Sequence, residues 1–303
     1  MRFLLVPLLL VAQLSAQEVL FEGNVLDSKT KEPIPYVNLS FLNTLKGTST
    51  DEKGHFYIDI PKTFLENKVH ISSLGYKDTI ITAKNLYASK IFKLVEKSFE
   101  LDEVVVSKSL GDSYVLNPIS SYSLTGGFAS SATPWVLALY FPNIGSQAKV
   151  IENVTVFMQK NPKFNDHSSK FRIRIYDVDP ITKAPNKDLV RKSLVLESEL
   201  DKDYVSLDLS SLNIKIPKEG VYIGLEWLFI SNNWFRNVSK HPITKKQIVE
   251  DRFAPTFSGV YVKNQNYRAM VYGMGKWTDF TVKSKNGSEN FVPAISLKIK
   301  KSN

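Results

Sequence analysis

The chain has 303 residues, of which 43% are hydrophobic and 23% charged, with 39 Lys and Arg against 30 Asp and Glu. This length and composition indicate a globular protein of two domains. The absence of cysteine excludes disulfide scaffolds, thiolate zinc sites and cysteine nucleophiles. Because only four histidines remain for metal or proton-transfer chemistry, the counts favour a binding or structural protein over an enzyme.

Residues 1–16 have the order of a secretory signal peptide. Arg2 precedes a run of Leu and Val, and the small residues Ser15 and Ala16 follow it. The apolar run is shorter than the roughly 20 residues that a membrane-spanning helix needs. We therefore expect cleavage before Gln17 and a protein that is exported but does not span a membrane. Its destination is the periplasm, the outer-membrane surface or the exterior.

Charge is distributed unevenly along the chain. Residues 17–106 hold 11 basic and 13 acidic side chains, whereas residues 107–303 hold 27 basic and 17 acidic ones. An exported protein rarely meets nucleic acid, so we expect no nucleic-acid partner. The excess of positive charge favours attraction to anionic lipid, lipopolysaccharide or acidic polysaccharide, or it serves only to keep the protein soluble.

Residues 17–106 show the period-two pattern of half-buried strands. Apolar and polar side chains alternate over residues 19–25, 37–41 and 56–60, and turn-forming residues separate these runs. Gly54 is expected to close a tight hairpin turn that needs the conformational freedom of glycine. Several strands in fewer than one hundred residues, without a helical repeat, predict a small β-sandwich.

This first domain resembles the carboxypeptidase regulatory-like domain. The resemblance rests on segments that occur in the expected order: Gly23–Asp27, Pro33–Leu39, Gly47–Asp51, Gly54–Phe56 and Ser73–Lys77. Residues 101–106 are similar to the segment that follows this domain in many TonB-dependent outer-membrane receptors. The resemblance implies a transthyretin-like, immunoglobulin-like sandwich that is non-catalytic and common in exported Bacteroidetes proteins.

The second half of the chain predicts a larger β-sandwich. Residues 107–119 are polar and irregular, which indicates a linker or a strap into the next fold. Alternating runs then recur in residues 120–303, at positions 154–158, 171–175, 205–209, 221–227 and 295–299. The whole chain is thus expected to be all-β, with the second sandwich of the jelly-roll type. This half also resembles uncharacterised sandwich domains that accompany the same regulatory-like module.

Hydrolase signatures are weak in this sequence. A zinc carboxypeptidase needs a His-x-x-Glu pair, and neither His70 nor His167 is followed by such a Glu. Residues 111–114 match the serine block of lipase-like esterases. No alternation of strands and helices surrounds this block, so a linker turn explains it better.

Calcium is the only cofactor that the sequence suggests. Asp177, Asp179 and Asp188 lie in an oxygen-rich loop after a strong strand, and calcium takes several oxygen ligands. Two prolines in this loop favour a plain connection between strands instead. A calcium site at Asp27 and Asp51 is a weaker alternative, because both residues also suit turns.

Two tryptophans outside the predicted strands are the candidate binding residues. Trp234 lies between Asn233 and Arg236, and Trp277 follows Lys276 and precedes Asp279. An indole beside amide and basic groups can hold a sugar ring by stacking and hydrogen bonding. The alternative is that both rings plug the open ends of the sandwich.

These observations predict an exported, non-enzymatic binding or scaffold protein of the cell envelope. Its partner would be a glycan or an outer-membrane protein, in a role such as glycan or nutrient uptake. The rival hypothesis is a polysaccharide hydrolase that uses Glu226 or Asp279, since glycosidases need only two carboxyl groups at a set separation.

Overall fold

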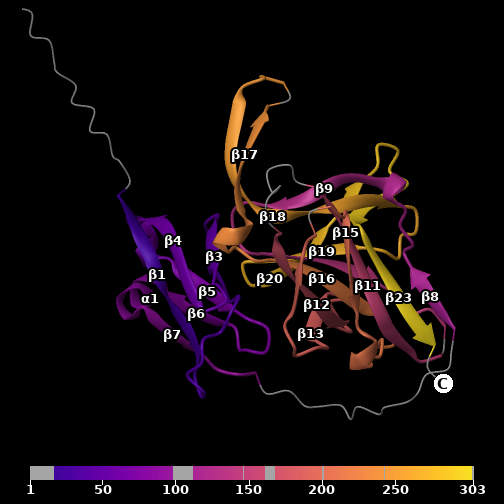
Figure 1. Cartoon of the computed structure of the whole chain (residues 1–303), viewed down its shortest axis with the longest axis horizontal. Coiled ribbons are helices and arrows are strands. Elements are labelled where there is room, and N and C mark those ends of the chain that lie inside the picture. Colours follow the sequence, from indigo (N-terminus) through magenta and orange to yellow (C-terminus); the bar gives the residue numbers. More distant parts are fainter. Residues whose placement is uncertain are drawn as a thin grey trace, which may run out of the picture.

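The computed structural model shows a nearly all-β protein built from two β-sandwiches, as predicted (Figure 1). It describes residues 17–97, 112–145, 147–160, 168–199, 201–241 and 243–301. The predicted signal peptide, the segment 101–106 and His167 lie outside these residues. Within the described ranges, no helix is both long and apolar enough to cross a membrane.

The first sandwich packs a three-stranded sheet against a four-stranded sheet. The three-stranded sheet has the order β4 (His55–Pro61), β1 (Glu18–Asp27), β7 (Ile91–Leu94). The four-stranded sheet has the order β3 (Lys46–Ser49), β2 (Asn38–Phe41), β5 (Lys68–Ser72), β6 (Thr79–Thr82). β1 runs antiparallel to β4 and parallel to β7.

Alternation of side chains builds the core of this sandwich. Phe21 and Val25 of β1 are fully buried and pack with Phe56 of the adjacent β4 and with Phe41 of β2 in the facing sheet. Gly54 closes the turn before β4 at a φ of +72°, as predicted, and a Cβ there would lie 2.9 Å from the Val25 carbonyl oxygen.

Two short helices, which the sequence analysis did not predict, complete the first sandwich. They are the 3-10 helix η1 (Lys62–Glu66) and the helix α1 (Ala83–Ser89). α1 buries only Ala83 and Leu86, so its seven residues carry too little apolar periodicity to stand out in the sequence.

The second sandwich packs a seven-stranded sheet against a nine-stranded sheet. The first has the order β13 (Pro185–Asp188), β12 (Lys170–Val178), β16 (Val221–Trp227), β10 (Val136–Phe141), β19 (Ala269–Gly273), β20 (Lys276–Phe280), with β14 (Leu194–Glu197) beside β12.

The nine-stranded sheet forms the other layer. Its main order is β21 (Val282–Lys283), β22 (Asn290–Pro293), β18 (Gln247–Val262), β11 (Lys149–Gln159), β23 (Ile295–Lys301), β8 (Ser113–Leu116). β15 (Tyr204–Asp208) pairs with β11, and β17 (Trp234–Lys240) and β9 (Leu124–Ser130) pair with β18. The 3-10 turns are η2 (Ser121–Ser123), η3 (Ser210–Leu212) and η4 (Ser231–Asn233).

β8 lies within the segment that the sequence indicates as a linker or strap. Its four residues pair with the last strand, β23, in an antiparallel ladder from Ser113 to Leu116. Leu116 is buried against the core of the second sandwich. This part of the segment therefore acts as a strap that closes the edge of a sheet.

Aromatic rings fill the centre of the second sandwich. Trp227 is fully buried and stacks on Trp135, with ring centroids 4.4 Å apart. Phe257 contacts both Trp227 and Phe171 edge to face. Trp227 thus belongs to the core of the second sandwich, and the half-buried Trp135 packs against it.

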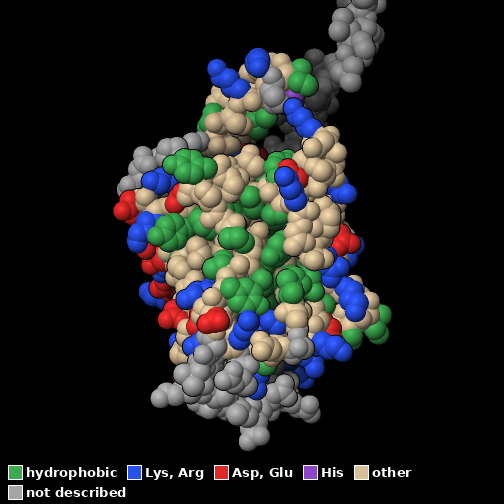
Figure 2. Space-filling view, turned by 90° about the vertical axis from the view of Figure 1, so that its right-hand side faces the viewer, with side chains coloured by type: hydrophobic (Ala, Val, Ile, Leu, Met, Phe, Trp, Pro, Cys, Tyr) green, Lys and Arg blue, Asp and Glu red, His purple; other side chains and the backbone are tan. Residues whose placement is uncertain are grey.

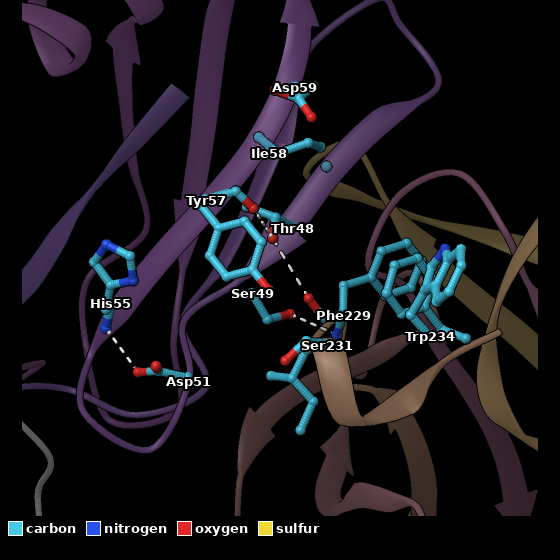
Figure 3. A pocket seen from close by; sticks show the side chains of 13 residues that line it. Thr48, Ser49, Asp51, His55, Tyr57, Ile58, Asp59, Phe229, Ser231 and Trp234 are labelled. Carbon is cyan, nitrogen blue, oxygen red and sulfur yellow. Dashed lines mark hydrogen bonds between the residues drawn. The ribbon is translucent and has the colours of Figure 1, made fainter. Parts of the chain in front are cut away.

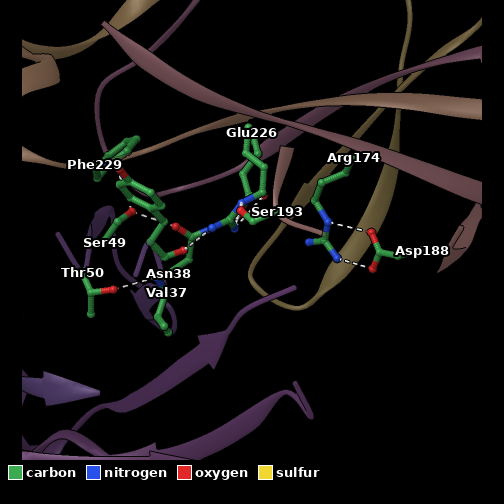
Figure 4. A network of polar contacts seen from close by, with 11 residues as sticks. Val37, Asn38, Ser49, Thr50, Arg174, Asp188, Ser193, Glu226 and Phe229 are labelled. Carbon is green, nitrogen blue, oxygen red and sulfur yellow. Dashed lines mark hydrogen bonds and ion pairs between the residues drawn. The ribbon is translucent and has the colours of Figure 1, made fainter. Parts of the chain in front are cut away.

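A buried polar network joins the two sandwiches (Figure 4). Arg172 and Glu226 lie opposite each other on β12 and β16 and form an ion pair, with Nη1 3.2 Å from Oε2. The Asn38 side-chain amide, from the first sandwich, donates to Glu226, and Arg172 donates to the Tyr36 carbonyl oxygen at 3.1 Å. Ser49 donates to the Asn38 side-chain oxygen at 2.7 Å.

Backbone contacts and apolar packing extend this interface. The Ser49 backbone N–H donates to the Phe229 carbonyl oxygen at 3.2 Å, and the Phe229 N–H donates to the Ser49 hydroxyl at 2.9 Å. Beside them, Tyr36 packs with Leu228 and Ile230 of the second sandwich. Satisfied polar groups and a small apolar cluster thus fix the orientation of the two domains.

Candidate ligand cleft between the two domains

A cleft of about 390 Å³ opens where the first sandwich meets the second (Figure 3). Its lining comes from β3, β4 and the turn between them on one side, and from the β16–β17 connection and β18 on the other. The lining residues are Gly47, Thr48, Ser49, Asp51, His55, Tyr57, Ile58, Asp59, Phe229, Ile230, Ser231, Trp234 and Phe253. A volume of this size accommodates one or two sugar rings or a comparable small molecule.

The inner wall of the cleft is held by the domain interface. The Thr48 hydroxyl lies 3.3 Å from the Tyr57 carbonyl oxygen and 3.4 Å from the Phe229 carbonyl oxygen, and it is buried. Ser49 is buried and bonded to Phe229 and Asn38. These hydroxyls are already used within the protein, so they shape the cleft and are not free to bind a ligand.

The first domain presents Tyr57 to the cleft. This ring is 52% exposed, because Tyr57 belongs to the outward-facing set of β4 while its neighbours Phe56 and Ile60 point into the core. His55 lies two residues earlier on the same side, with ring centroids 6.1 Å apart. Asp59, two residues later, is also exposed and lines the cleft.

The second domain presents Trp234 at the start of β17. Its indole is 44% exposed and lies opposite Phe253 in the β17–β18 ladder. Phe229 stacks on Phe253 with centroids 3.9 Å apart, which gives an apolar floor. The Arg236 guanidinium carbon lies 5.7 Å from the centre of the Trp234 ring, close enough for a cation–π contact.

The arrangement is suited to a ligand with both apolar and hydroxyl-rich surfaces. Tyr57 and Trp234 supply ring faces from opposite walls, and Asp59 and Ser231 add hydrogen-bonding groups to the lining. The Asp51 Oδ1 atom already accepts from the backbone N–H groups of Lys53 and His55, at 2.8 and 2.9 Å, and so mainly holds its turn.

The structure corrects the prediction that Asn233 is a ligand-binding residue. It is fully buried, and its side-chain amide donates to the carbonyl oxygens of Lys170 and Leu228. Its Oδ1 atom accepts from the Lys170 N–H at 2.9 Å. Asn233 therefore anchors the turn that positions Trp234 and has no group left for a ligand.

The predicted site around Trp277 does not lie in this cleft. The Trp277 ring is half-buried on β20 and packs edge to face against Tyr176 at 5.4 Å and against Tyr272 at 5.2 Å. Lys276 and Asp279, which flank it, are exposed. The contacts support the packing interpretation of Trp277, on the outer face of the seven-stranded sheet.

The three aspartates suggested for calcium do not form a metal site. Asp188 forms a two-bond ion pair with Arg174, whose Nε lies 2.9 Å from Oδ1. Asp177 accepts from the Lys187 N–H, and Asp179 caps its own turn through the backbone N–H of residues 181 and 182. Among the described residues, no cluster of three or more acidic or histidine side chains could hold a metal ion.

Asp27 and Glu226 are also committed to structural contacts. Asp27, in the weaker calcium alternative, is buried and accepts from the N–H groups of Lys29 and Thr30 and from the Tyr76 hydroxyl.

Glu226, a residue of the rival hydrolase hypothesis, is 1% exposed and paired with Arg172. It has no access to a substrate, so the expectation of a catalytic role for Glu226 is wrong.

The residues that the first domain contributes to the cleft were not predicted from the sequence. The alternation of β4 already indicates that Tyr57 and Asp59 face outward, since Phe56, Ile58 and Ile60 were placed on the other face. The alternation predicts that these two side chains are exposed on the first sandwich, but it does not predict which part of the chain lies next to them. Phe229 and Phe253 gave no signal, because their stacking joins segments more than twenty residues apart.

Comparison with known proteins identifies the first domain. Residues 21–106 match the family model of the CarboxypepD_reg-like domain. The chain contains this domain. The match covers the small sandwich and stops before the second one, and a comparison with curated proteins gives no match.

A solved structure similar to this chain is that of a clostridial cysteine protease, Cwp84, after propeptide cleavage. The sequence identity is 11% and the TM-score 0.36, over 78% of this chain. This chain matches 52% of that protein, or about half of its length.

Proposed function

We propose that this chain is an exported, non-enzymatic binding protein of the cell envelope that holds a glycan in the cleft between its two domains. The observation that carries the proposal is the pairing of Tyr57 and Trp234, two exposed rings from separate domains, across one cleft. Exposed aromatic rings beside carboxylate and hydroxyl groups are typical of sugar-binding sites.

The regulatory-like domain supports the location that we propose. The resemblance is to a domain that is common in exported Bacteroidetes proteins, and residues 101–106 are similar to the segment that follows this domain in many TonB-dependent outer-membrane receptors. We therefore propose a protein of the periplasm, outer-membrane surface or exterior of such a bacterium. A role in glycan or nutrient uptake, beside an outer-membrane protein, follows from that location.

The proposal is tested by a glycan array and by titration of the best glycan. We expect residues 17–303 to bind, and Trp234→Ala and Tyr57→Ala each to weaken binding about tenfold or more, because each removes one stacking surface. The melting temperature should stay nearly unchanged, since both rings are half-exposed. Calcium should have no effect on binding.

Tyr122→Ala is the matched control, because Tyr122 is a fully exposed ring outside the cleft. Unchanged affinity in this variant would show that the loss is specific to the cleft. Loss of affinity in all three variants, or early unfolding of the cleft variants, would contradict the proposed site.

A hydrolase remains the second candidate, because two carboxylates, Asp51 and Asp59, line the same cleft as Trp234. Glycosidases place two carboxyl groups on either side of the bond that they cleave. Incubation of the bound glycan with the protein, followed by a reducing-end assay, separates the two candidates. New reducing ends that disappear in Asp59→Asn would favour the hydrolase, and an intact glycan would favour binding alone.

A further inference from the structure

A long hairpin projects from the second sandwich, formed by β17 and the first half of β18 (Figure 1). Seven residue pairs join the two strands, from Trp234 with Phe253 at the base to Lys240 with Gln247 near the tip. Phe235 of β17 and Ala254 of β18 are buried and pack together at the base of the hairpin. Beyond the base, both faces of the hairpin are largely open to solvent.

The outer half of this hairpin is positively charged. Residues 238–249 contain three lysines, Lys240, Lys245 and Lys246, and one histidine but no acidic residue. The acidic residues that follow along β18 lie closer to the base, where Asp251 pairs with Arg236 and Glu250 pairs with Arg252. Figure 2 shows the projecting end at the top, where blue Lys and Arg side chains gather without red ones.

Large aliphatic side chains are exposed among these lysines. Ile243 at the tip is 84% exposed, and Val238 and Val249, which pair across the ladder, are 48% and 54% exposed. Lysines alone would be explained as protection of a sheet edge against aggregation. That explanation does not account for the four exposed aliphatic side chains of the segment, Val238, Ile243, Ile248 and Val249, which protection would disfavour.

The tip is held in a defined shape by its own hydrogen bonds. The His241 Nδ1 atom accepts from the N–H groups of Ile243 and Thr244, at 3.3 and 3.1 Å. The His241 N–H donates to the Lys246 carbonyl oxygen at 2.8 Å, and the Lys245 N–H donates to the His241 carbonyl oxygen at 3.0 Å. These hydrogen bonds hold the backbone of Ile243 beside His241 at the tip.

We propose that the outer half of the β17–β18 hairpin, in its described residues 238–241 and 243–249, docks onto an anionic lipid surface. The lysines would lie at the level of the phosphate headgroups, and Ile243 would insert between them. This combination of basic and aliphatic side chains is what interfacial binding requires, since charge attracts and apolar burial retains. A soluble polyanion would pair with the lysines, but it would not bury the exposed aliphatic side chains. The inference is independent of the glycan cleft.

The test is flotation of residues 17–303 with phosphatidylcholine vesicles, with and without phosphatidylglycerol. Omission of residues 1–16 prevents their apolar run from binding lipid by itself. We expect binding only to the anionic vesicles and release as salt screens the charges. A triple variant, Lys240→Gln, Lys245→Gln and Lys246→Gln, should bind roughly a hundredfold more weakly, because each lysine near such a surface contributes roughly fivefold.

Ile243→Ser tests insertion separately from charge. We expect it to weaken vesicle binding roughly tenfold while the melting temperature stays unchanged, because the side chain is exposed in the free protein. The matched charge control replaces three exposed lysines of β13 and the connections beside it, Lys183, Lys187 and Lys192, by Gln. This control should retain most of the vesicle binding.

Three results would overturn the inference. The first is failure of the unaltered protein to float with anionic vesicles. The second is an equal loss of binding in the hairpin triple variant and the control triple variant, which would indicate a general effect of net charge. The third is tight binding to soluble polygalacturonate together with no effect of Ile243→Ser on vesicle binding, which would indicate a polyanion site.

Discussion

Asp27 illustrates how a single side chain can resemble a ligand in sequence and serve the fold in structure. Its carboxylate accepts two backbone N–H groups, at 2.7 and 2.8 Å, and the Tyr76 hydroxyl at 3.0 Å. The backbone hydrogen bonds from Thr30 and Lys29 hold the pKa of Asp27 below its usual value. Burial and the bond to Asp27 raise the pKa of Tyr76 to about 12.

These shifts give the stability of the protein a defined acid dependence. Since the pKa of Asp27 is lower in the folded chain, its contribution is complete above the unfolded value near 4 and is lost as pH falls through the folded value. We expect Asp27→Asn to lower stability at pH 7 and to flatten the decline below pH 4. Urea unfolding at several pH values measures both effects.

Tyr76→Phe provides the comparison for this measurement. It removes one hydroxyl donor to Asp27 and leaves both backbone N–H donors in place, so most of the acid dependence should remain. If Asp27→Asn and Tyr76→Phe gave the same pH profile, the role assigned to the backbone hydrogen bonds of Asp27 would be wrong.

At the scale of elements, the pairing of β12 and β16 places two charges in the interior. Arg172 and Glu226 are 1% exposed and stand opposite each other in the ladder. Arg172 also donates to the Ser193 hydroxyl at 3.0 Å, and Glu226 accepts from Asn38. With these partners, the pair is satisfied on every side, which a buried ion pair requires.

Removal of one charge should therefore be costly. We expect Glu226→Gln to lower the free energy of unfolding by about 3–5 kcal/mol, because Arg172 is left as an unpaired buried charge. Guanidinium unfolding gives the value. A double variant, Arg172→Met with Glu226→Leu, should recover much of the loss. A change below about 1 kcal/mol in Glu226→Gln would show that water or a rearrangement compensates the charge.

At the scale of the whole molecule, the fit between the domains depends on small side chains as well as polar ones. Gly47 of β3 lies against Pro134 of the second sandwich, and an added Cβ would be 2.5 Å from its Cδ atom. The same Cβ would be 2.7 Å from the Leu39 carbonyl oxygen. Neither neighbour can move without shifting backbone, so the two domains approach closely only because residue 47 has no side chain.

We expect Gly47→Ala to lower the free energy of unfolding by about 1–3 kcal/mol, as overpacking does. It should also weaken ligand binding, because Gly47 lines the cleft and the domains must shift to relieve the contact. Thermal unfolding and ligand titration measure the two effects. Gly273→Ala is the matched control, since a Cβ there meets no atom within 4 Å. Equal behaviour of both variants would contradict a close interdomain fit at residue 47.

Local patterns in the sequence were sufficient to predict the two sandwiches. Strand alternation depends only on which face of a strand is buried, so Phe21, Phe41 and Phe171 were placed correctly from their neighbours. The turn at Gly54 was predicted for the same reason, because its requirement for positive φ is local. The regulatory-like domain was recognised from segments that build these turns and strands.

The cleft and the domain interface were decided only by the tertiary structure. Trp234 was selected from its flanking residues, but Tyr57 lines the same cleft from 177 positions earlier in the chain. Asn233 and Glu226 are residue types that often occur in binding or catalytic sites. In this protein both are buried: Asn233 is hydrogen-bonded to backbone groups, and Glu226 forms an ion pair with Arg172. The residues that flank a polar side chain can be the same whether that side chain contacts a ligand or another strand. Its partner depends on the packing of distant segments, which the local sequence does not specify.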